Sequence, residues 1–448
     1  MRVLLAVHAF PPRSTAGVEV YTLRLARALR ARGNEVLVLS AVHDLGAEPY
    51  EVRRREHEGL EVVEVVNVHH RGTLEATYDD PGVDRASAPL LREFRPDCVH
   101  FQHLVNLSRG LVRAARAVAA RTVFTLHDYW LSCPRDGLRM RADLALCTTM
   151  DHGVCARCLG DSPYLVPPLQ RGIAGAARGI GLGRYLHRLH DRAPRFTEAV
   201  LGLLRRAAPP AEGSLADAMD RRALALRATL EEVDVILAPT AFARDRAIEF
   251  GARPDRTRVL RLGVLRSPAR PRAAGQRRRL GFVGTLAPHK GVHVLVDAFR
   301  GLGDPEATLG IHGSESVYPS YAAALRSAAA PDPRIRFHGP FPESEQERVL
   351  GQMDVLVQPS VWWENSPLTV LEALGGGLPV VASDIGGVPE LLADEDAGVL
   401  VPPGDVIALR DALAAVVAGT RLAGAREALP LKAAAEHAAE IEAVYAGA

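Results

Sequence analysis

The stretch Gln358–Glu390, QPSVWWENSPLTVLEALGGGLPVVASDIGGVPE, decides how the rest of this chain is interpreted. It follows an apolar run at residues 353–357, which predicts a buried strand, and it leads into an apolar-periodic helix from about Pro367. Ser366 suits the N-cap position, and Pro367 suits the first helical position. The loop 364–366 is therefore expected to lie against free N–H groups at a positive helix end, which favours an anion there.

Two carboxylates frame this helix start. Glu364 lies in the loop and Glu372 about a turn and a half into the helix, so both can face one ligand. One carboxylate could orient a sugar and the other a ribose diol. Taken alone, the Glu-x7-Glu spacing is more typical of two solvated glutamates on one helix face. The neighbouring Trp362 and Trp363, with a second apolar strand at residues 378–382, favour a binding site instead.

This run resembles the donor-binding segment of the retaining glycosyltransferases of family 4. The shared pattern is a Pro-Ser pair, Glu-x7-Glu, a helix closed by glycines, a strand and then GGVPE. The resemblance covers nearly the whole chain apart from one insertion. It implies the GT-B fold, an α/β architecture in which two Rossmann-like doubly wound domains face each other across a cleft. The repeated strand-then-helix pattern indicates the same class independently.

Length and composition agree with this class. A chain of 448 residues with 48% hydrophobic residues predicts about two or three domains with sizeable cores. The formal net charge of +1 argues against a nucleic-acid binder. No uninterrupted apolar run reaches about 18 residues, so we expect no transmembrane helix. The start, MRVLLAVHAFPP, is interpreted as a first buried strand rather than a signal peptide, and the protein is expected to be cytoplasmic.

The domain organisation follows from the elements and the resemblance. We expect an N-terminal acceptor-side domain over residues 1–265, with a Cys-cluster and Arg-rich insertion at about 131–227. Residues 266–279, rich in arginine with two prolines, indicate an exposed linker. A C-terminal nucleotide-sugar-binding domain should span 280–425, and the resemblance implies that a final helix within 426–448 packs back on the first domain.

The first domain offers candidate contacts at strand ends. A flexible loop before a helix from about Val18 ends in Gly17, and the resemblance implies that this glycine lies close to the donor phosphate. His127 ends a predicted strand at 122–127. A lone histidine there is more often structural, but the resemblance implies that His127 contacts the transferred sugar, with Asp128 as a candidate orienting partner.

The second domain opens with its own motif, LGFVGTLAPHKG. A strand at 280–283 should lead through a loop that begins at Gly284 into a helix near Lys290. A lysine at a helix N-terminus costs a few tenths to about 1 kcal/mol unless an anion is bound there; the alternative is a lysine screened by solvent. The resemblance implies that Gly284 and Lys290 contact the donor diphosphate. Thr285 stands where family members usually carry an arginine, so helix-end amides, Thr285, His289 or a linker arginine would have to compensate.

Four cysteines fall close together in the insertion, in the pattern C-x13-C-x7-C-x2-C: Cys133, Cys147, Cys155 and Cys158. Without a secretion signal this pattern favours a structural zinc site. Redox-active thiols or a disulfide, an iron–sulfur cluster and unrelated thiols stay open as alternatives. Cys98, in an apolar strand, is expected to be a core residue.

The segment from Gly160 to about Arg227 is basic and partly amphipathic. One interpretation is peripheral contact with an anionic membrane face or a lipid-linked acceptor. The interpretation we favour is a solvated helical face packed on its own domain, because glycine and proline interrupt the periodicity. The arginines in question are Arg171, Arg178, Arg184, Arg188, Arg192, Arg195, Arg205 and Arg206.

The sequence thus predicts a retaining glycosyltransferase that moves a sugar from a nucleotide-diphospho-sugar to an acceptor hydroxyl on a glycan, a lipid-linked compound or a small molecule. Lys290 and the helix amides would stabilise the departing diphosphate, while Glu364 and His127 hold the sugar. The resemblance implies that no metal or other cofactor is required for catalysis. A sugar-nucleotide epimerase or hydrolase on the same fold and a non-catalytic nucleotide-sugar-binding protein are the alternatives. The expected donor contacts are Gly17, Gly284, Thr285, Lys290, Asn365, Ser366, Pro367, Leu368 and Glu372.

Overall fold

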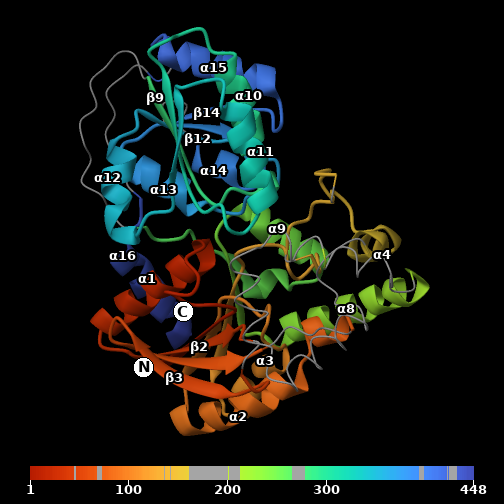
Figure 1. Ribbon diagram of the computed structural model, residues 1–448. Coiled ribbons are helices and arrows are strands. Elements are labelled where there is room, and N and C mark those ends of the chain that lie inside the picture. The colour runs from red at the N-terminus through yellow and green to blue at the C-terminus, as the bar shows by residue number, and fades with distance from the viewer. Residues whose placement is uncertain are drawn as a thin grey trace.

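The computed structural model describes residues 1–44, 47–67, 73–135, 137–141, 143–160, 200, 212–264, 278–392, 398–420, 422 and 431–447. Two separate sheets organise them, and each sheet is covered by helices on both faces (Figure 1). The eight arginines of the basic segment and residues 266–277 of the expected linker lie outside the described residues.

The N-terminal sheet has eight strands in the order β3-β4-β2-β1-β5-β6-β7-β8. Neighbouring strands are parallel except β3, which pairs antiparallel with β4. The strands are β1 (Arg2–Val7), β2 (Glu35–Val42), β3 (Val52–His57), β4 (Leu60–Val66), β5 (Cys98–Phe101), β6 (Arg121–Thr125), β7 (Val235–Ala238) and β8 (Thr257–Val259). The helices are α1 (Gly17–Ala31), α2 (Pro81–Phe94), α3 (Gly110–Ala117), α4 (His152–Gly160), α8 (Glu212–Glu232) and α9 (Ala241–Phe250).

The C-terminal sheet has six parallel strands in the order β11-β10-β9-β12-β13-β14. The strands are β9 (Arg279–Val283), β10 (Thr308–His312), β11 (Ile335–Gly339), β12 (Val355–Gln358), β13 (Val380–Ser383) and β14 (Gly398–Val401). The helices are α10 (Val292–Arg300), α11 (Pro319–Ala329), α12 (Gln346–Gly351), α13 (Leu368–Gly375), α14 (Val388–Leu391), α15 (Val406–Val417) and α16 (Ala434–Ala446), with short 3-10 turns η3 (Pro288–Lys290) and η4 (Glu343–Glu345).

One hydrophobic core joins the two domains. Side chains alternate across a strand, so Leu4 of β1 belongs to the core under α2, α3, α8 and α9, whereas Leu5 belongs to a second core under α1. That second core continues through α16 to α12, α13 and α14 of the C-terminal domain. The C-terminal domain is closed on its other face by α10, α11 and α15.

The last helix belongs spatially to the first domain. In Figure 1 the blue α16 lies beside the red α1, and the C-terminus lies in the lower, N-terminal domain. Two buried hydrogen bonds anchor it: Tyr21 Oη lies 2.7 Å from His437 Nε2, and His100 Nδ1 lies 2.7 Å from Tyr445 Oη. The chain therefore crosses between the domains twice, which ties their relative positions together.

The GT-B arrangement expected from the sequence is confirmed, and Cys98 is a core residue, 1% exposed. The elements that were not predicted from the sequence include β3, α2, α11 and α12. The edge strand β3 alternates exposed and half-buried residues with few apolar ones, so its signal is weak. Helix α2 carries Pro89 in its interior, which argues against a helix locally, although its buried face packs on the first core.

Two local expectations were wrong. Ser366 is not the N-cap of α13: Pro367 occupies that position, with extended backbone angles and no side-chain cap. Lys290 is not at the start of a helix. It ends the 3-10 turn η3, and α10 begins only at Val292. Gly291 causes this break: its φ is +68°, and a Cβ there would lie 1.8 Å from the carbonyl oxygen of Pro359.

Within the described residues, every helix is too short or too polar to cross a bilayer.

Candidate active site

The candidate site lies at the carboxyl ends of β9 and β12, the two central strands of the C-terminal sheet. The chain runs from β9 outward through β10 and β11 on one side and returns at β12 on the other. Such a reversal leaves a crevice between the two loops that follow these strands, and open α/β sheets bind ligands there. The loops are 284–291 after β9 and 359–367 after β12.

Lys290 and Glu364 join these two loops. The Lys290 ammonium donates a hydrogen bond to Glu364 Oε1 at 2.8 Å, and the Glu364 side chain is only 4% exposed. Two further side chains bind the same oxygen: Ser360 Oγ, on the β12 loop, donates to Oε1 at 2.6 Å, and Gln358 Nε2, at the end of β12, donates at 3.1 Å. Burial opposes ionisation of Glu364, but the charge and hydrogen bond of Lys290 hold its pKa below the ordinary value.

An aromatic side chain covers this pair. The Lys290 ammonium lies 4.9 Å from the centre of the Trp362 ring, and the His289 ring packs edge-on against Trp362 at 5.0 Å. Burial, and then the neighbouring ammonium of Lys290, lower the pKa of His289 to about 3. His289 is therefore neutral at pH 7 and adds no positive charge to the site.

Of the other expected donor contacts, Gly284 and Thr285 belong to the β9 loop, whereas Gly17 lies in the N-terminal domain. Gly284 has a φ of +157°, and its N–H donates to the His312 carbonyl at 3.0 Å. Thr285 is half-buried, and Gly17 is exposed at the beginning of α1.

Helix α13 begins directly after the β12 loop, and its N-terminus has no side-chain cap. Pro367 makes no side-chain cap, and Leu368 begins the helix. The first N–H groups of a helix have no partner within the helix, so they and the positive helix end suit an anion. Ser366 is half-buried beside them.

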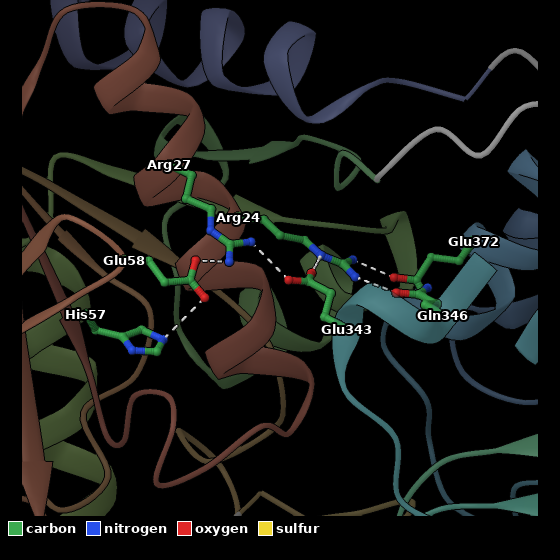
Figure 2. A network of polar contacts seen from close by, with 7 residues as sticks. All are labelled: Arg24, Arg27, His57, Glu58, Glu343, Gln346 and Glu372. Carbon is green, nitrogen blue, oxygen red and sulfur yellow. Dashed lines mark hydrogen bonds and ion pairs between the residues drawn. The ribbon is translucent and has the colours of Figure 1, made fainter. Parts of the chain in front are cut away.

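Glu372 lies one turn further along α13, and its partner comes from the other domain. Arg24 of α1 donates from Nη1 to Glu372 Oε1 at 2.5 Å (Figure 2). The same guanidinium contacts Glu343 Oε1 at 2.5 Å and Gln346 Oε1 at 2.9 Å. Arg24 and Glu372 are 4% and 7% exposed, so this is a buried ion pair between domains. Burial raises the pKa of Glu372, and Arg24 works against that rise.

Asn365 connects the site to the N-terminal domain through two hydrogen bonds. Its amide donates to the carbonyl oxygen of Leu126 at 2.9 Å, and its Oδ1 accepts from Thr240 Oγ1 at 3.2 Å. His127, the residue after Leu126, therefore lies next to the Glu364–Asn365 loop. The imidazole Nε2 lies 2.9 Å from Gln102 Oε1, and burial lowers the pKa of His127 to about 3. Since the Gln102 oxygen accepts, Nδ1 of the neutral ring is left to accept from a hydroxyl.

Asp128 does not orient His127. Its Oδ2 lies 2.7 Å from His103 Nε2, and its Oδ1 accepts the N–H of Trp130 at 2.8 Å. The sequence-based pairing with His127 is therefore replaced by a pairing with His103, since both carboxylate oxygens of Asp128 are engaged elsewhere. His103 was missed as a partner, although the strand-end run at residues 100–103 contains two histidines.

Glu390, the last residue of the GGVPE pattern, was also missed. Its carboxylate accepts the N–H groups of Ala241 at 2.8 Å and Phe242 at 2.7 Å. These are the first two residues of α9 in the N-terminal domain. The glycines before it allow close packing, because a Cβ at Gly386 would lie 2.1 Å from the Glu364 carbonyl oxygen. The GGVPE segment therefore contacts both the loop that carries Glu364 and helix α9 of the N-terminal domain.

The four clustered cysteines are all free thiols. Cys133 and Cys147 flank a small hairpin closed by a bridge between Met140 and Leu146, while Cys155 and Cys158 lie on α4. Burial, and then the other three thiols, raise the pKa of Cys155 to about 12, so the four side chains lie close enough to affect one another. In the described part of the chain, no three His, Cys, Asp or Glu side chains are arranged to hold a metal ion.

Two packed α/β domains, with a lysine–carboxylate pair at the switch point of the second sheet, fit the GT-B class. The family comparison identifies the family itself. The profile "Glycosyltransferase Family 4" matches residues 15–156, and the profile "Glycosyl transferases group 1" matches residues 277–418, together more than half of the chain. The chain belongs to this glycosyltransferase family.

Individual relatives agree with this assignment. The chain is 32% identical to a D-inositol 3-phosphate glycosyltransferase of Corynebacterium glutamicum over 39% of its length, and this match spans 46% of that relative, a little under half. It is 28% identical to the 2-deoxystreptamine glucosyltransferase of Streptomyces kanamyceticus over 88% of the chain and 87% of the relative. The crystal structure of Anabaena HepE with UDP and glucose shares the fold, with a TM-score of 0.60 at 15% identity and full coverage of both chains.

Proposed function

We propose that this protein is a retaining glycosyltransferase that uses a nucleotide-diphospho-sugar as donor. The observation that carries the proposal is the Lys290–Glu364 pair at the switch point of the C-terminal sheet, 2.8 Å apart and next to an uncapped helix end. A fixed cation and free helix amides beside a crevice are the elements that stabilise a departing diphosphate.

The proposal assigns a role to each of the main side chains of the site. Lys290 and the first amides of α13 bind the diphosphate, and Glu372 accepts the ribose hydroxyls. Glu364 and His127 hydrogen-bond the hydroxyls of the sugar from opposite sides. Thr285 carries no charge, so the helix end takes the larger share of the diphosphate charge.

The proposed reaction balances without a protein nucleophile. The bond between the sugar's anomeric carbon and the diphosphate oxygen breaks, and a bond from the same carbon to the acceptor oxygen forms on the same face. The acceptor's proton passes to the departing diphosphate oxygen. The protein contributes positioning and charge stabilisation, which account for much of the rate enhancement in such transfers.

The relatives suggest which substrates to test first. HepE of Anabaena was crystallised with UDP and glucose, which favours UDP-glucose as the first donor. The Streptomyces kanamyceticus relative, matched over nearly its whole length, is named for 2-deoxystreptamine, and the Corynebacterium glutamicum relative for inositol phosphate. Both names denote cyclic polyols, so small cyclitols are the first acceptors, followed by glycans and lipid-linked sugars.

A structural zinc ion bound by the four clustered cysteines remains part of the proposal. The thiolates would have to close around the ion, and the C-x2-C pair on α4 provides two ligands on one helix face. Two buried arginines beside the cluster support it: Arg139 and Arg222 are 6% and 1% exposed. Both bind backbone carbonyls, and neither forms an ion pair with a carboxylate of the described residues. Four thiolates around Zn²⁺ carry a net charge of −2, which would balance them.

A cytoplasmic location, with or without peripheral contact to the inner membrane face, is likewise proposed from the sequence. The arginine-rich segment on which membrane contact would depend lies outside the described residues. Sedimentation with vesicles that contain anionic lipids checks this point.

Incubation with labelled nucleotide sugars, with and without acceptors, tests the proposed activity. Nucleotide released only when an acceptor is present, together with a product of unchanged anomeric configuration, is the expected result. Acceptor-independent conversion of the donor would replace the proposal with an epimerase or hydrolase. Binding without any turnover would indicate a nucleotide-sugar-binding protein.

A further inference from the structure

The ion pair between Arg24 and Glu372 is the buried end of a longer network. From the surface inward it runs through Glu58, Arg27, Glu343, Arg24 and Glu372, with alternating charge (Figure 2). Side-chain exposure falls along it from 44% at Glu58 to 4% at Arg24 and 7% at Glu372. Surface pairs are worth little, whereas a buried charge without its partner is costly. The buried Arg24–Glu372 pair therefore contributes most of the interaction free energy of this network.

The network also crosses the domain boundary. Arg24 and Arg27 lie on α1 of the N-terminal domain, and Glu343, Gln346 and Glu372 come from η4, α12 and α13 of the other domain. Arg24 Nε and Nη2 bind Glu343 and Gln346, which leaves Nη1 fixed against Glu372. Because the guanidinium is planar and held at three points, it also fixes the direction of the Glu372 carboxylate.

We propose that Arg24 is a positioning residue for the donor: from the N-terminal domain, it holds the Glu372 carboxylate charged and aligned to accept the hydroxyls of the donor's ribose. This inference rests on the proposed role of Glu372. A carboxylate has about four acceptor positions. Arg24 uses one and Gln346 contributes another contact, which leaves acceptor capacity for a diol. Donor affinity then depends on both domains, although the predicted donor contacts beyond Gly17 and His127 lie in the second.

Charge explains why Glu372 needs this partner. The groups that face it are the cation Arg24, the anion Glu343 and the neutral Gln346, with Arg27 and Glu58 further out. Burial and Glu343 raise the pKa of Glu372, while Arg24 and Gln346 lower it. Without Arg24, Glu372 would take up a proton at a higher pH and would lose acceptor capacity for hydroxyls.

The test compares Arg24→Gln with Arg27→Gln in the full chain. Arg27 belongs to the same network and contacts Glu343, but it is 38% exposed and does not contact Glu372. Steady-state kinetics with the donor found active in the panel, and calorimetric binding of its nucleoside diphosphate, are measured from pH 5.5 to 8.5. Arg24→Gln should raise the donor KM and the diphosphate Kd roughly tenfold, with kcat changed less than about threefold. The acid limb of donor binding should move to higher pH, and Arg27→Gln should stay within about twofold of the wild type.

Three results would overturn the inference. One is an unchanged donor KM in folded Arg24→Gln. Another is tighter donor binding by that variant, which would make Arg24 a competitor of the donor. The third is an equal effect of Arg27→Gln. If Arg24→Gln does not fold, Arg24→Lys keeps the charge but not the three-point contact, and an unchanged KM there overturns the inference equally. A wild-type protein that binds no nucleotide sugar would instead refute the proposed function.

Discussion

Lys290 and Glu364, 74 residues apart in sequence, form a 2.8 Å hydrogen-bonded ion pair that connects the loops after the two central strands of the C-terminal sheet. Only two lysines occur among the 54 basic residues of this chain, and the other is Lys432. A lysine is a compact point charge, whereas a guanidinium is broad and planar. The ammonium lies 4.9 Å from the centre of the Trp362 ring.

Replacing Lys290 should abolish most transfer without unfolding the protein. In Lys290→Ala the departing diphosphate loses its fixed cation, and we expect kcat to fall about 10²–10³-fold. Lys432→Ala is the matched control, because that lysine pairs with Glu440 at the surface of the last helix. Near-normal rates in Lys290→Ala with an unchanged melting temperature would remove Lys290 from the site.

Glu390 should couple the C-terminal domain to helix α9. Its carboxylate accepts two N–H groups at the α9 N-terminus, at 2.8 and 2.7 Å. Losing a cap of this kind costs about 0.5–2 kcal/mol. Glu390→Ala should therefore lower the unfolding free energy in urea by about 1 kcal/mol. Glu249→Ala, at the exposed end of the same helix, is the control. Equal stability of the two variants would mean that the contact contributes nothing.

Metal content decides between the interpretations of the cysteine cluster. Protein purified without chelator should contain close to one equivalent of zinc, and Cys155→Ser with Cys158→Ser should lose it. Cys98→Ala, in the core of the first domain, should keep it. Less than about half an equivalent in the wild type would contradict the zinc proposal, because structural zinc sites bind tightly enough to survive purification.

Buried histidines should make the fold acid-sensitive. Burial lowers the pKa of His437 to about 3, so the folded protein keeps this ring neutral while the unfolded chain protonates it below about pH 6.5. The unfolded state then binds more protons between those values, and stability falls as pH falls through this window, by up to about 1.4 kcal/mol per pH unit for each such histidine.

The variant His437→Gln tests that contribution. Glutamine can retain a hydrogen bond to Tyr21, which lies 2.7 Å from His437 Nε2, but it does not titrate. Urea unfolding at several values between pH 7.5 and 5 should show a shallower loss of stability than in the wild type. An identical slope would show that His437 is not among the groups responsible.

Particular residues mark where sequence-based prediction succeeded. The apolar runs at β9, β12 and β13 located strands to within about two residues, because the hydrophobic pattern of a strand is local. The motif around Glu364 assigned that residue to a loop after a buried strand, where it lies, whereas Lys290, expected at a helix start, ends the 3-10 turn η3. Ser366 was assigned wrongly as N-cap, because Pro367 takes extended backbone angles that the sequence does not reveal.

What the sequence by itself determined was the GT-B class, many of the buried strands, and the loop that carries Glu364. The tertiary structure decided which groups of one domain pair with which groups of the other. Arg24 and Glu372 are 348 residues apart, and Glu390 and Ala241 are 149 apart. Hydrophobic periodicity describes contacts within a few turns of the chain. Partners brought together by domain packing leave no such local pattern, so only the folded chain identifies Arg24 as the residue that faces Glu372.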